Sequence, residues 1–226
     1  NCSVASVTNN APSVYPLGTT IVTWTVTDGS GNVASTTQTI TVSDLINPII
    51  VAPATVNANA NSGCVAFDVN LGVPTVSDNC TIASVTNNAP NTFTLGTTTV
   101  TWTATDASGN VATATQTVIV SDVTAPSLVV PSNVTVNVNN ACTATGVTLG
   151  SPVTSDNCSV ASVTNNAPVI FNIGTTIVTW TVTDPSGNVT TGTQTVTVLD
   201  STFPTIIAPS NISIVATSGC SISGIE

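Results

Sequence analysis

Apolar residues alternate with threonine along much of the chain. In the segment TTIVTWTVTD, Val22, Trp24 and Val26 fall on one side of a two-residue period and threonines fall on the other. This period is typical of a β-strand that buries one face. The segment STTQTITVSD alternates in the same way, and its β-branched residues favour a pleated surface. Between the two segments lies DGSGN, whose Gly and Asn residues indicate a hairpin turn.

The same strand–turn–strand block occurs three times. It reads VTWTVTDGSGNVA, VTWTATDASGNVA and VTWTVTDPSGNVT, and the copies are 78 residues apart, as are the corresponding cysteines. This period exceeds the roughly 20 to 50 residues of a solenoid repeat and suits a small domain with its own core. We therefore predict a tandem array of domains. Each copy has one tryptophan as its expected core residue: Trp24, Trp102 and Trp180.

The period divides the chain into two full units and two partial ones. The full units are residues 48–125 and 126–203. Residues 1–47 correspond to the C-terminal part of a unit, and residues 204–226 to the N-terminal part of a further unit. Each full unit offers about seven apolar segments separated by turn signals, together with its tryptophan. This pattern predicts an all-β fold of tandem immunoglobulin-like or fibronectin-III-like β-sandwich domains, arranged as an elongated rod.

The charge composition excludes several classes of function. The chain has no Lys, Arg or His, and its ten acidic residues give a net charge of −10. Binding to nucleic acid requires cations that are absent. No apolar run approaches the roughly 20 residues of a membrane span, so this segment should not insert into a membrane. Without His or Lys as a base we expect no enzyme. The lack of lysine on edge strands leaves open lateral pairing between copies.

Each full unit contains two cysteines at fixed places, which is typical of disulfides formed in an oxidising compartment. Zinc is the alternative, but no CxxC pair and no His is present. A bond between Cys64 and Cys80 must bridge a strand, which is too long unless the segment folds back. A bond between Cys64 and Cys158 would instead join successive units. The disulfide candidates are Cys64, Cys80, Cys142 and Cys158.

These motifs resemble the HYR (hyalin repeat) module, an extracellular immunoglobulin-like domain associated with adhesion. The resemblance rests on SDNC, LGTTTVTWTATDASGN and TQTVIVSD, and it extends over essentially the whole chain. It implies a self-contained module, which favours the pairing of Cys64 with Cys80. Many HYR modules carry four cysteines, whereas these units carry two. The near-identical copies also resemble the giant surface adhesins of Bacteroidetes-type bacteria.

The expected sandwich topology brings carboxylates together. The last strand of a unit ends at VSD, and the DNC triplet and the TDxSGN turn should be the B–C and F–G loops of the next unit, at its facing pole. Because no side chain can neutralise them, Ca²⁺ is the natural partner. Alternatively, each Asp caps its own turn. The predicted calcium ligands are Asp44, Asp78 and Asp106 at one junction, and Asp122, Asp156 and Asp184 at the next.

The repetition itself indicates a function. We predict a non-catalytic stalk segment of a large extracellular adhesin or surface fibre, at the cell surface. Its partners would be neighbouring repeats of the same chain and other copies in a fibre, and Ca²⁺ is the only candidate cofactor. A self-assembling filament subunit that pairs through β-edges is one alternative. An array that binds a glycan or protein ligand is the other.

Overall fold

The computed structural model describes residues 3–215 and 219, and within them the chain is all-β, as predicted. No described segment forms a helix that could cross a membrane. The chain forms two compact units. The first comprises Asn1–Ser127, Thr154–Ser162 and Val182–Thr190. The second comprises Leu128–Val153, Val163–Thr181 and Thr191–Glu226.

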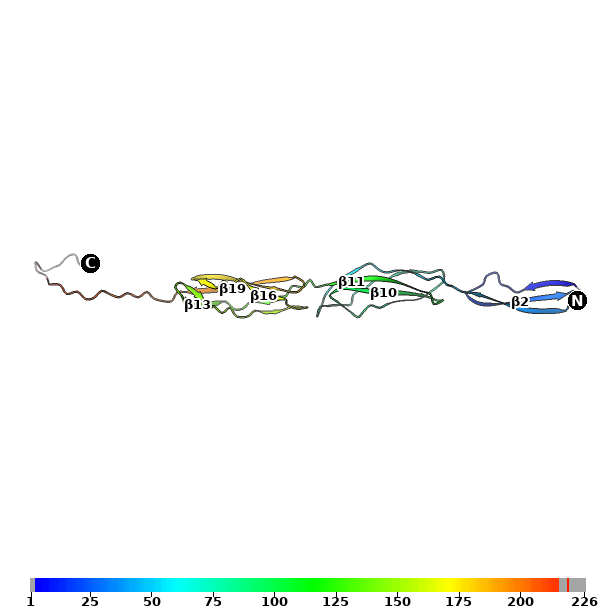
Figure 1. The fold of residues 1–226 in the computed structure, drawn as a ribbon, viewed down its shortest axis with the longest axis horizontal. Helices are drawn as coiled ribbons and strands as arrows, with labels where there is room; N and C mark the ends of the chain where they lie inside the picture. Colours follow the sequence, from blue (N-terminus) through cyan, green and yellow to red (C-terminus); the bar gives the residue numbers. More distant parts are fainter. Residues whose placement is uncertain (1–2, 216–218, 220–226) are drawn as a thin grey trace. The chain divides into compact units, whose positions relative to one another are not determined.

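The N-terminal part is a three-stranded antiparallel sheet in the order β1-β2-β3 (Figure 1). No other described strand pairs with it. Trp24 on β2 is 38 % exposed, in contrast to its predicted core position, because no second layer of strands covers this face. The strands are β1 (Val4–Asn9), β2 (Gly18–Asp28) and β3 (Val33–Val42).

The first full repeat is a two-layered β-sandwich. One layer is a four-stranded sheet in the order β5-β11-β10-β8, and the strand pairs β4–β7 and β6–β9 form the other. The long hairpin of β10 and β11 is antiparallel, whereas β5 pairs in parallel with the end of β11. The strands are β4 (Ile49–Val51), β5 (Val56–Asn59), β6 (Val65–Phe67), β7 (Thr75–Ser77), β8 (Ile82–Asn87), β9 (Thr92–Thr94), β10 (Gly96–Asp106) and β11 (Val111–Ser121).

The second full repeat has the same strand order. Its four-stranded sheet runs β13-β19-β18-β16, accompanied by the pairs β12–β15 and β14–β17. The same alternation of small or apolar residues with Thr in the two repeats gives matching burial patterns on their long hairpins. The strands are β12 (Ser127–Val129), β13 (Val134–Asn137), β14 (Thr143–Thr145), β15 (Val153–Ser155), β16 (Ser162–Asn165), β17 (Ile170–Asn172), β18 (Gly174–Thr183) and β19 (Val189–Leu199).

Each core combines aliphatic side chains with a buried Trp–Gln pair. Trp102 is 6 % exposed, and its indole N–H donates to Oε1 of Gln116 at 3.0 Å. The Gln116 amide nitrogen donates to the carbonyl oxygens of Ala54 and Leu71, both at 2.9 Å. A fully buried glutamine therefore satisfies one indole donor and two backbone acceptors, as buried polar groups require. Trp180 and Gln194 form the corresponding pair in the second repeat.

Candidate functional site

The aspartate of each hairpin turn closes its own turn. Asp106 accepts hydrogen bonds from the backbone N–H groups of Ser108 at 2.9 Å and Asn110 at 2.8 Å. The side-chain amide of Asn110 donates to its other oxygen at 2.7 Å. Asn188 makes the same two contacts to Asp184, through its backbone N–H and its side-chain amide. Burial raises the pKa of Asp184, but the hydrogen bonds from Asn188, Gly187 and Ser186 together outweigh this effect and the pKa is lowered. These two carboxylates thus act as turn caps.

A second aspartate lies in the linker before each full repeat. Asp44 is 8 % exposed, and its Oδ1 accepts from the backbone N–H of Ile46 and the side-chain amide of Asn79, both at 3.1 Å. These two bonds are the largest of the contacts that lower the pKa of Asp44. Its Oδ2 and Oδ1 of Asp78 are buried without a hydrogen-bond partner. The ligand atoms of Asp44, Asp78 and Cys80 all lie within 4.8 Å of one another.

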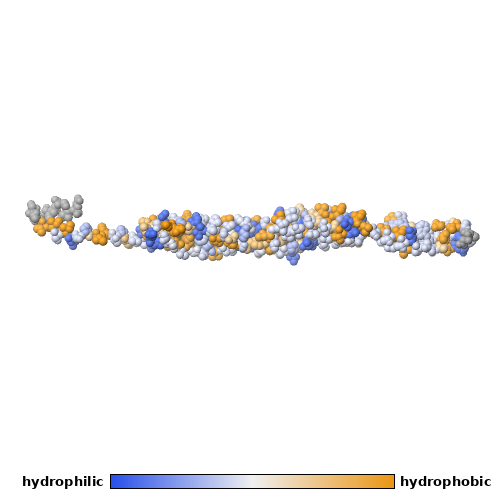
Figure 2. Space-filling model, viewed as in Figure 1, coloured by the Kyte–Doolittle hydropathy of each residue, from blue (hydrophilic) through white to orange (hydrophobic). Residues whose placement is uncertain are grey.

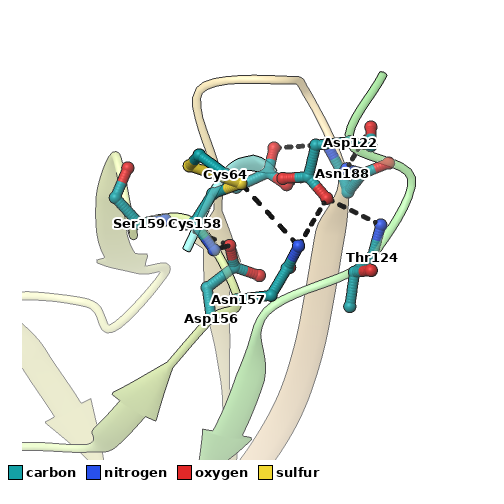
Figure 3. Close-up of a disulfide and its surroundings, with 9 residues drawn as sticks. Cys64, Asp122, Thr124, Asp156, Asn157, Cys158, Ser159 and Asn188 are labelled. Carbon is teal, nitrogen blue, oxygen red and sulfur yellow. Dashed lines mark hydrogen bonds between the residues drawn. A yellow bond between two sulfur atoms is a disulfide. The ribbon is translucent and has the colours of Figure 1, made fainter. Parts of the chain in front are cut away.

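The next linker carries an equivalent cluster (Figure 3). Asp122 is 7 % exposed and accepts from the Asn157 amide at 3.2 Å and the backbone N–H of Thr124 at 3.1 Å. The carboxylate oxygens of Asp122 and Asp156 and the disulfide-bonded Sγ of Cys158 again lie within 4.8 Å of one another. Three buried oxygens lack a partner here: Asp122 Oδ2, Asp156 Oδ1 and Asn157 Oδ1. Three acceptors with no donor make this cluster the better candidate cation site.

The structure therefore brings together two of each predicted set of three aspartates. Asp106 and Asp184 are not members of the two ligand clusters. Their turns reach the linkers through an asparagine instead. The Asn110 side-chain amide donates to the Asp44 carbonyl at 3.2 Å, and that of Asn188 donates to the Asp122 carbonyl at 3.3 Å. The course of the chain in a sandwich indicates that each hairpin turn lies near the linker. Whether the Asp or the Asn of the turn contacts the linker depends on the hydrogen bonds within the turn, which the sequence does not give.

A disulfide joins the two full repeats beside the second cluster. Cys64 is bonded to Cys158, with a Cα–Cα distance of 4.6 Å across a sequence separation of 94 residues. The backbone N–H of Gly63 donates to the Asn157 carbonyl at 3.0 Å and supports the same contact. Figure 3 shows the bond next to Asp156 and Asn157.

The HYR resemblance had favoured the pairing of Cys64 with Cys80, and the structure differs for a topological reason. Cys64 follows β5, whose parallel pairing places it at the end of the sandwich where β11 also ends. Cys80 lies at the opposite end, beside Asp44. Cys80 and Cys142 are free and exposed. The Asp44 carboxylate, together with burial and the neighbouring negative charges, raises the pKa of the Cys80 thiol. A raised pKa keeps the thiol protonated and slow to react.

The fold and these junctions define a protein of tandem β-sandwich repeats, in which a disulfide links one repeat to the next. The HYR domain family matches residues 43–120 and 121–198. The chain belongs to this family, which confirms the resemblance drawn from the sequence. Both matched ranges begin five residues before the predicted unit boundaries, and each has the length of one period.

Two sea-urchin proteins are similar in sequence. The chain is 37 % identical over 210 residues to hyalin from Strongylocentrotus purpuratus, covering 87 % of this chain and 18 % of that protein. It is 35 % identical over 222 residues to hyalin from Lytechinus variegatus, covering 92 % of this chain and 42 % of that protein. The chain thus spans less than half the length of either hyalin.

The solved structures to which the chain is similar include cadherin ectodomains. Drosophila N-cadherin EC1-4 is 13 % identical, with a TM-score of 0.39 and coverage of 82 % of this chain and 59 % of that chain. Protocadherin Gamma B2 extracellular cadherin domains 1-5 is 13 % identical, with a TM-score of 0.33 and coverage of 82 % and 47 %.

Proposed function

We propose that this chain is a non-catalytic structural segment of an extracellular adhesion-type HYR repeat protein, with Ca²⁺ binding at its repeat junctions. The observation that carries the metal is the set of three buried, unpartnered oxygens on Asp122, Asp156 and Asn157. The chain contains no Lys, Arg or His, so no side chain can neutralise these carboxylates. Burying an unpaired charge is costly, and a bound cation removes that cost.

The donor chemistry fits Ca²⁺. This ion takes six to eight oxygen ligands from carboxylates, amide oxygens, carbonyls and water. Asp122, Asp156 and Asn157 would hold the ion at one junction, and Asp44 and Asp78 would hold it at the other. Bound Ca²⁺ supplies charge neutralisation and no reaction. The turn aspartates Asp106 and Asp184 already have donors and stay outside this assignment.

The stalk role rests on how the repeats are connected. The Cys64–Cys158 disulfide ties one repeat to the next, and Asn188 ties a hairpin turn to the linker at Asp122. Bonds of this kind limit the movement of one repeat relative to the next, which suits a stalk that holds other parts of an assembly apart. The extracellular location agrees with the disulfide, which persists in oxidising compartments. The unit boundaries at 48–125 and 126–203 and the setting in a bacterial surface adhesin stay predictions from the sequence.

Thermal unfolding tests the metal assignment. The melting temperature should be higher in 1 mM Ca²⁺ than in EDTA, because a ligand that binds only the folded state stabilises it by about 2.7 kcal/mol at a hundred times its Kd. The double variant Asp122→Asn/Asp156→Asn should lose most of that increase. Asp200→Asn is the matched control, because Asp200 is exposed and caps only the backbone N–H of Thr202.

Two results would contradict the metal assignment. One is an equal melting temperature of the wild-type chain in Ca²⁺ and EDTA. The other is an equal gain in Mg²⁺ at the same ionic strength, which would indicate charge screening alone. For the stalk role, small-angle scattering should give a larger radius of gyration in Ca²⁺ than in EDTA. An unchanged radius would argue against a calcium-stiffened stalk.

A further inference from the structure

One cysteine of the disulfide belongs to the same triplet as two of the candidate calcium ligands. Asp156, Asn157 and Cys158 are consecutive in the sequence. Oδ1 of Asp156 and Oδ1 of Asn157 are buried without a hydrogen-bond partner, and Cys158 is bonded to Cys64 of the first full repeat. The covalent bond between the repeats therefore ends within two residues of two of the three oxygens that carry the metal assignment.

Hydrogen bonds determine which oxygens of this triplet remain free. The backbone N–H groups of Cys158 and Ser159 both donate to Oδ2 of Asp156, at 2.8 and 3.1 Å, and its Oδ1 is left without a donor. The side-chain amide of Asn157 donates to Oδ1 of Asp122 at 3.2 Å and to Sγ of Cys158 at 3.7 Å. A disulfide sulfur thus helps to orient an amide whose oxygen is a candidate ligand (Figure 3).

The first full repeat holds the triplet through one short loop. Gly63 and Cys64 are neighbours in the loop between β5 and β6. The Gly63 N–H donates to the backbone carbonyl of Asn157 at 3.0 Å, and Cys64 forms the disulfide with Cys158. Of these two contacts only the disulfide is covalent. Its reduction leaves a single backbone hydrogen bond from Gly63 to keep the triplet in place.

Electrostatic repulsion acts against this arrangement. Carboxylate oxygens of Asp122 and Asp156 lie within 4.8 Å of each other, and the chain has no Lys, Arg or His. Figure 2 shows a surface that is mostly of intermediate hydropathy, as expected of a chain whose polar residues are largely uncharged. Two like charges at this distance repel each other. Without a cation, the triplet is therefore pushed away from Asp122, and the disulfide opposes that movement.

We propose that the Cys64–Cys158 disulfide sets the calcium affinity of the site formed by Asp122, Asp156 and Asn157. The oxidised chain binds tightly and the reduced chain binds weakly. This inference rests on the calcium binding proposed above. In the oxidised chain the ion meets oxygens that are already close together. In the reduced chain the triplet must first return to Asp122, and an ion that binds only this fraction of the molecules shows a correspondingly weaker apparent affinity.

The coupling orders two events in the life of the chain. Reduction by glutathione transfers two electrons and two protons to the disulfide and gives two cysteine thiols and one glutathione disulfide. Thiols stay reduced in the cytosol, whereas disulfides form and persist in extracellular compartments. The site therefore reaches its full affinity only after the chain has entered an oxidising compartment. Disulfide formation comes first and calcium binding follows.

Calorimetric titration of the 226-residue chain with Ca²⁺ tests the coupling. Asp44→Asn/Asp78→Asn is introduced into every sample, so that only the site beside the disulfide is measured. Cys64→Ala breaks the bond and leaves residues 156–158 unchanged, and it should raise the Kd for Ca²⁺ by about 5- to 150-fold, the usual range of coupling between two sites. Cys142→Ala is the matched control, because it removes a free, exposed thiol and should leave the Kd unchanged.

The possible results separate this inference from the proposed function. Equal Kd values for Cys64→Ala and the control would overturn the coupling and leave calcium binding intact. The absence of calcium binding by the oxidised chain would overturn both. Near-UV circular dichroism of the buried Trp102 and Trp180 shows whether each variant is folded at the temperature of the titration.

A second measurement keeps all the native cysteines. The chain is equilibrated in glutathione redox buffers with saturating Ca²⁺ or with EDTA, free thiols are alkylated, and the Cys64–Cys158 bond is quantified by mass spectrometry. Because coupling is reciprocal, calcium should raise the equilibrium constant for disulfide formation by the same factor by which oxidation lowers the Kd. A bond that only stabilises the fold would not respond to calcium in this way. An equal equilibrium constant in Ca²⁺ and EDTA would overturn the proposal.

Discussion

A Cβ atom placed on Gly192 would lie 2.6 Å from Cγ1 of Val130, closer than non-bonded carbon atoms are found in proteins. The corresponding positions in the first repeat hold Ala114 and Ala52. The first repeat thus combines the larger Ala114 with the smaller Ala52, and the second combines the smaller Gly192 with the larger Val130. Two substitutions between otherwise similar repeats compensate one another in volume.

This relationship gives a coupled prediction. Gly192→Ala should destabilise the chain by about 1 to 3 kcal/mol, because the added methyl group overpacks a filled core. Val130→Ala alone should also destabilise, by leaving a cavity. The double variant recreates the pair found in the first repeat and should be more stable than either single variant. Urea unfolding of all four proteins gives the coupling energy. If the losses of stability in the two single variants simply add in the double variant, the contact between residues 130 and 192 does not explain why these two residues differ together.

The buried glutamine predicts a large effect from a change that preserves size. Gln116→Leu leaves the Trp102 indole N–H and the carbonyls of Ala54 and Leu71 without partners. Each unsatisfied buried group costs about 1 to 3 kcal/mol, so we expect a loss of at least about 3 kcal/mol. The control is Gln38→Leu, where only the bond from Trp24 is lost. Chemical denaturation checks the difference, and equal losses at the two sites would refute this role.

The alternation of Val and Thr around Trp102 predicted the strands and the hairpin, because a two-residue period is typical of a half-buried strand. The sandwich was predicted from about seven such segments in each unit together with the tryptophan. The alternation could not assign the role of Gln116. A glutamine in an apolar row looks the same in sequence whether it lies at a solvent edge or in the core. Its acceptors at Ala54 and Leu71 come from loops whose path only the folded chain defines.

Acid should destabilise the chain in a defined window. The pKa values of Asp28 and Asp44 are lowered from 3.8 by hydrogen bonds, chiefly from Asn32 and Ile46 respectively. The folded state therefore prefers the charged form. The stabilisation of the folded state by these two charged carboxylates is complete above about pH 4 and is lost as the pH falls through their lowered pKa values. Melting temperatures in EDTA should be level from pH 7 to 5 and decline below pH 4. Stability that rises on acidification would contradict the sign.

The disulfide between repeats should be stabilising. Closing a loop of this length contributes about 4.7 kcal/mol on the chain-entropy estimate. We expect Cys64→Ser/Cys158→Ser to lower the denaturation midpoint clearly, and reductant to do the same to the wild-type chain. Cys142→Ser removes a free, exposed thiol and is the matched control. Equal midpoints for the double variant and the control would show that the bond adds no stability.

The junctions were less predictable than the strands. Sandwich topology alone indicated that Asp44 and Asp78 would approach each other, and the structure places them together. It could not distinguish Asp106 from them, because a carboxylate that caps its own turn and one that faces a neighbour share the same spacing. The cysteine pairing was also open, since it depends on which end of the sandwich each loop reaches.

A pull on the two ends of the chain would follow the sulfur–sulfur bridge between Cys64 and Cys158. The peptide between them, a separation of 94 residues, would carry no tension. At about 3.3 to 3.6 Å per residue, this is on the order of 300 Å of contour length held in reserve. An oxidised chain should therefore reach its limit of extension early, and reduction should release the reserve. The redox state of one bond sets how far the chain can be stretched.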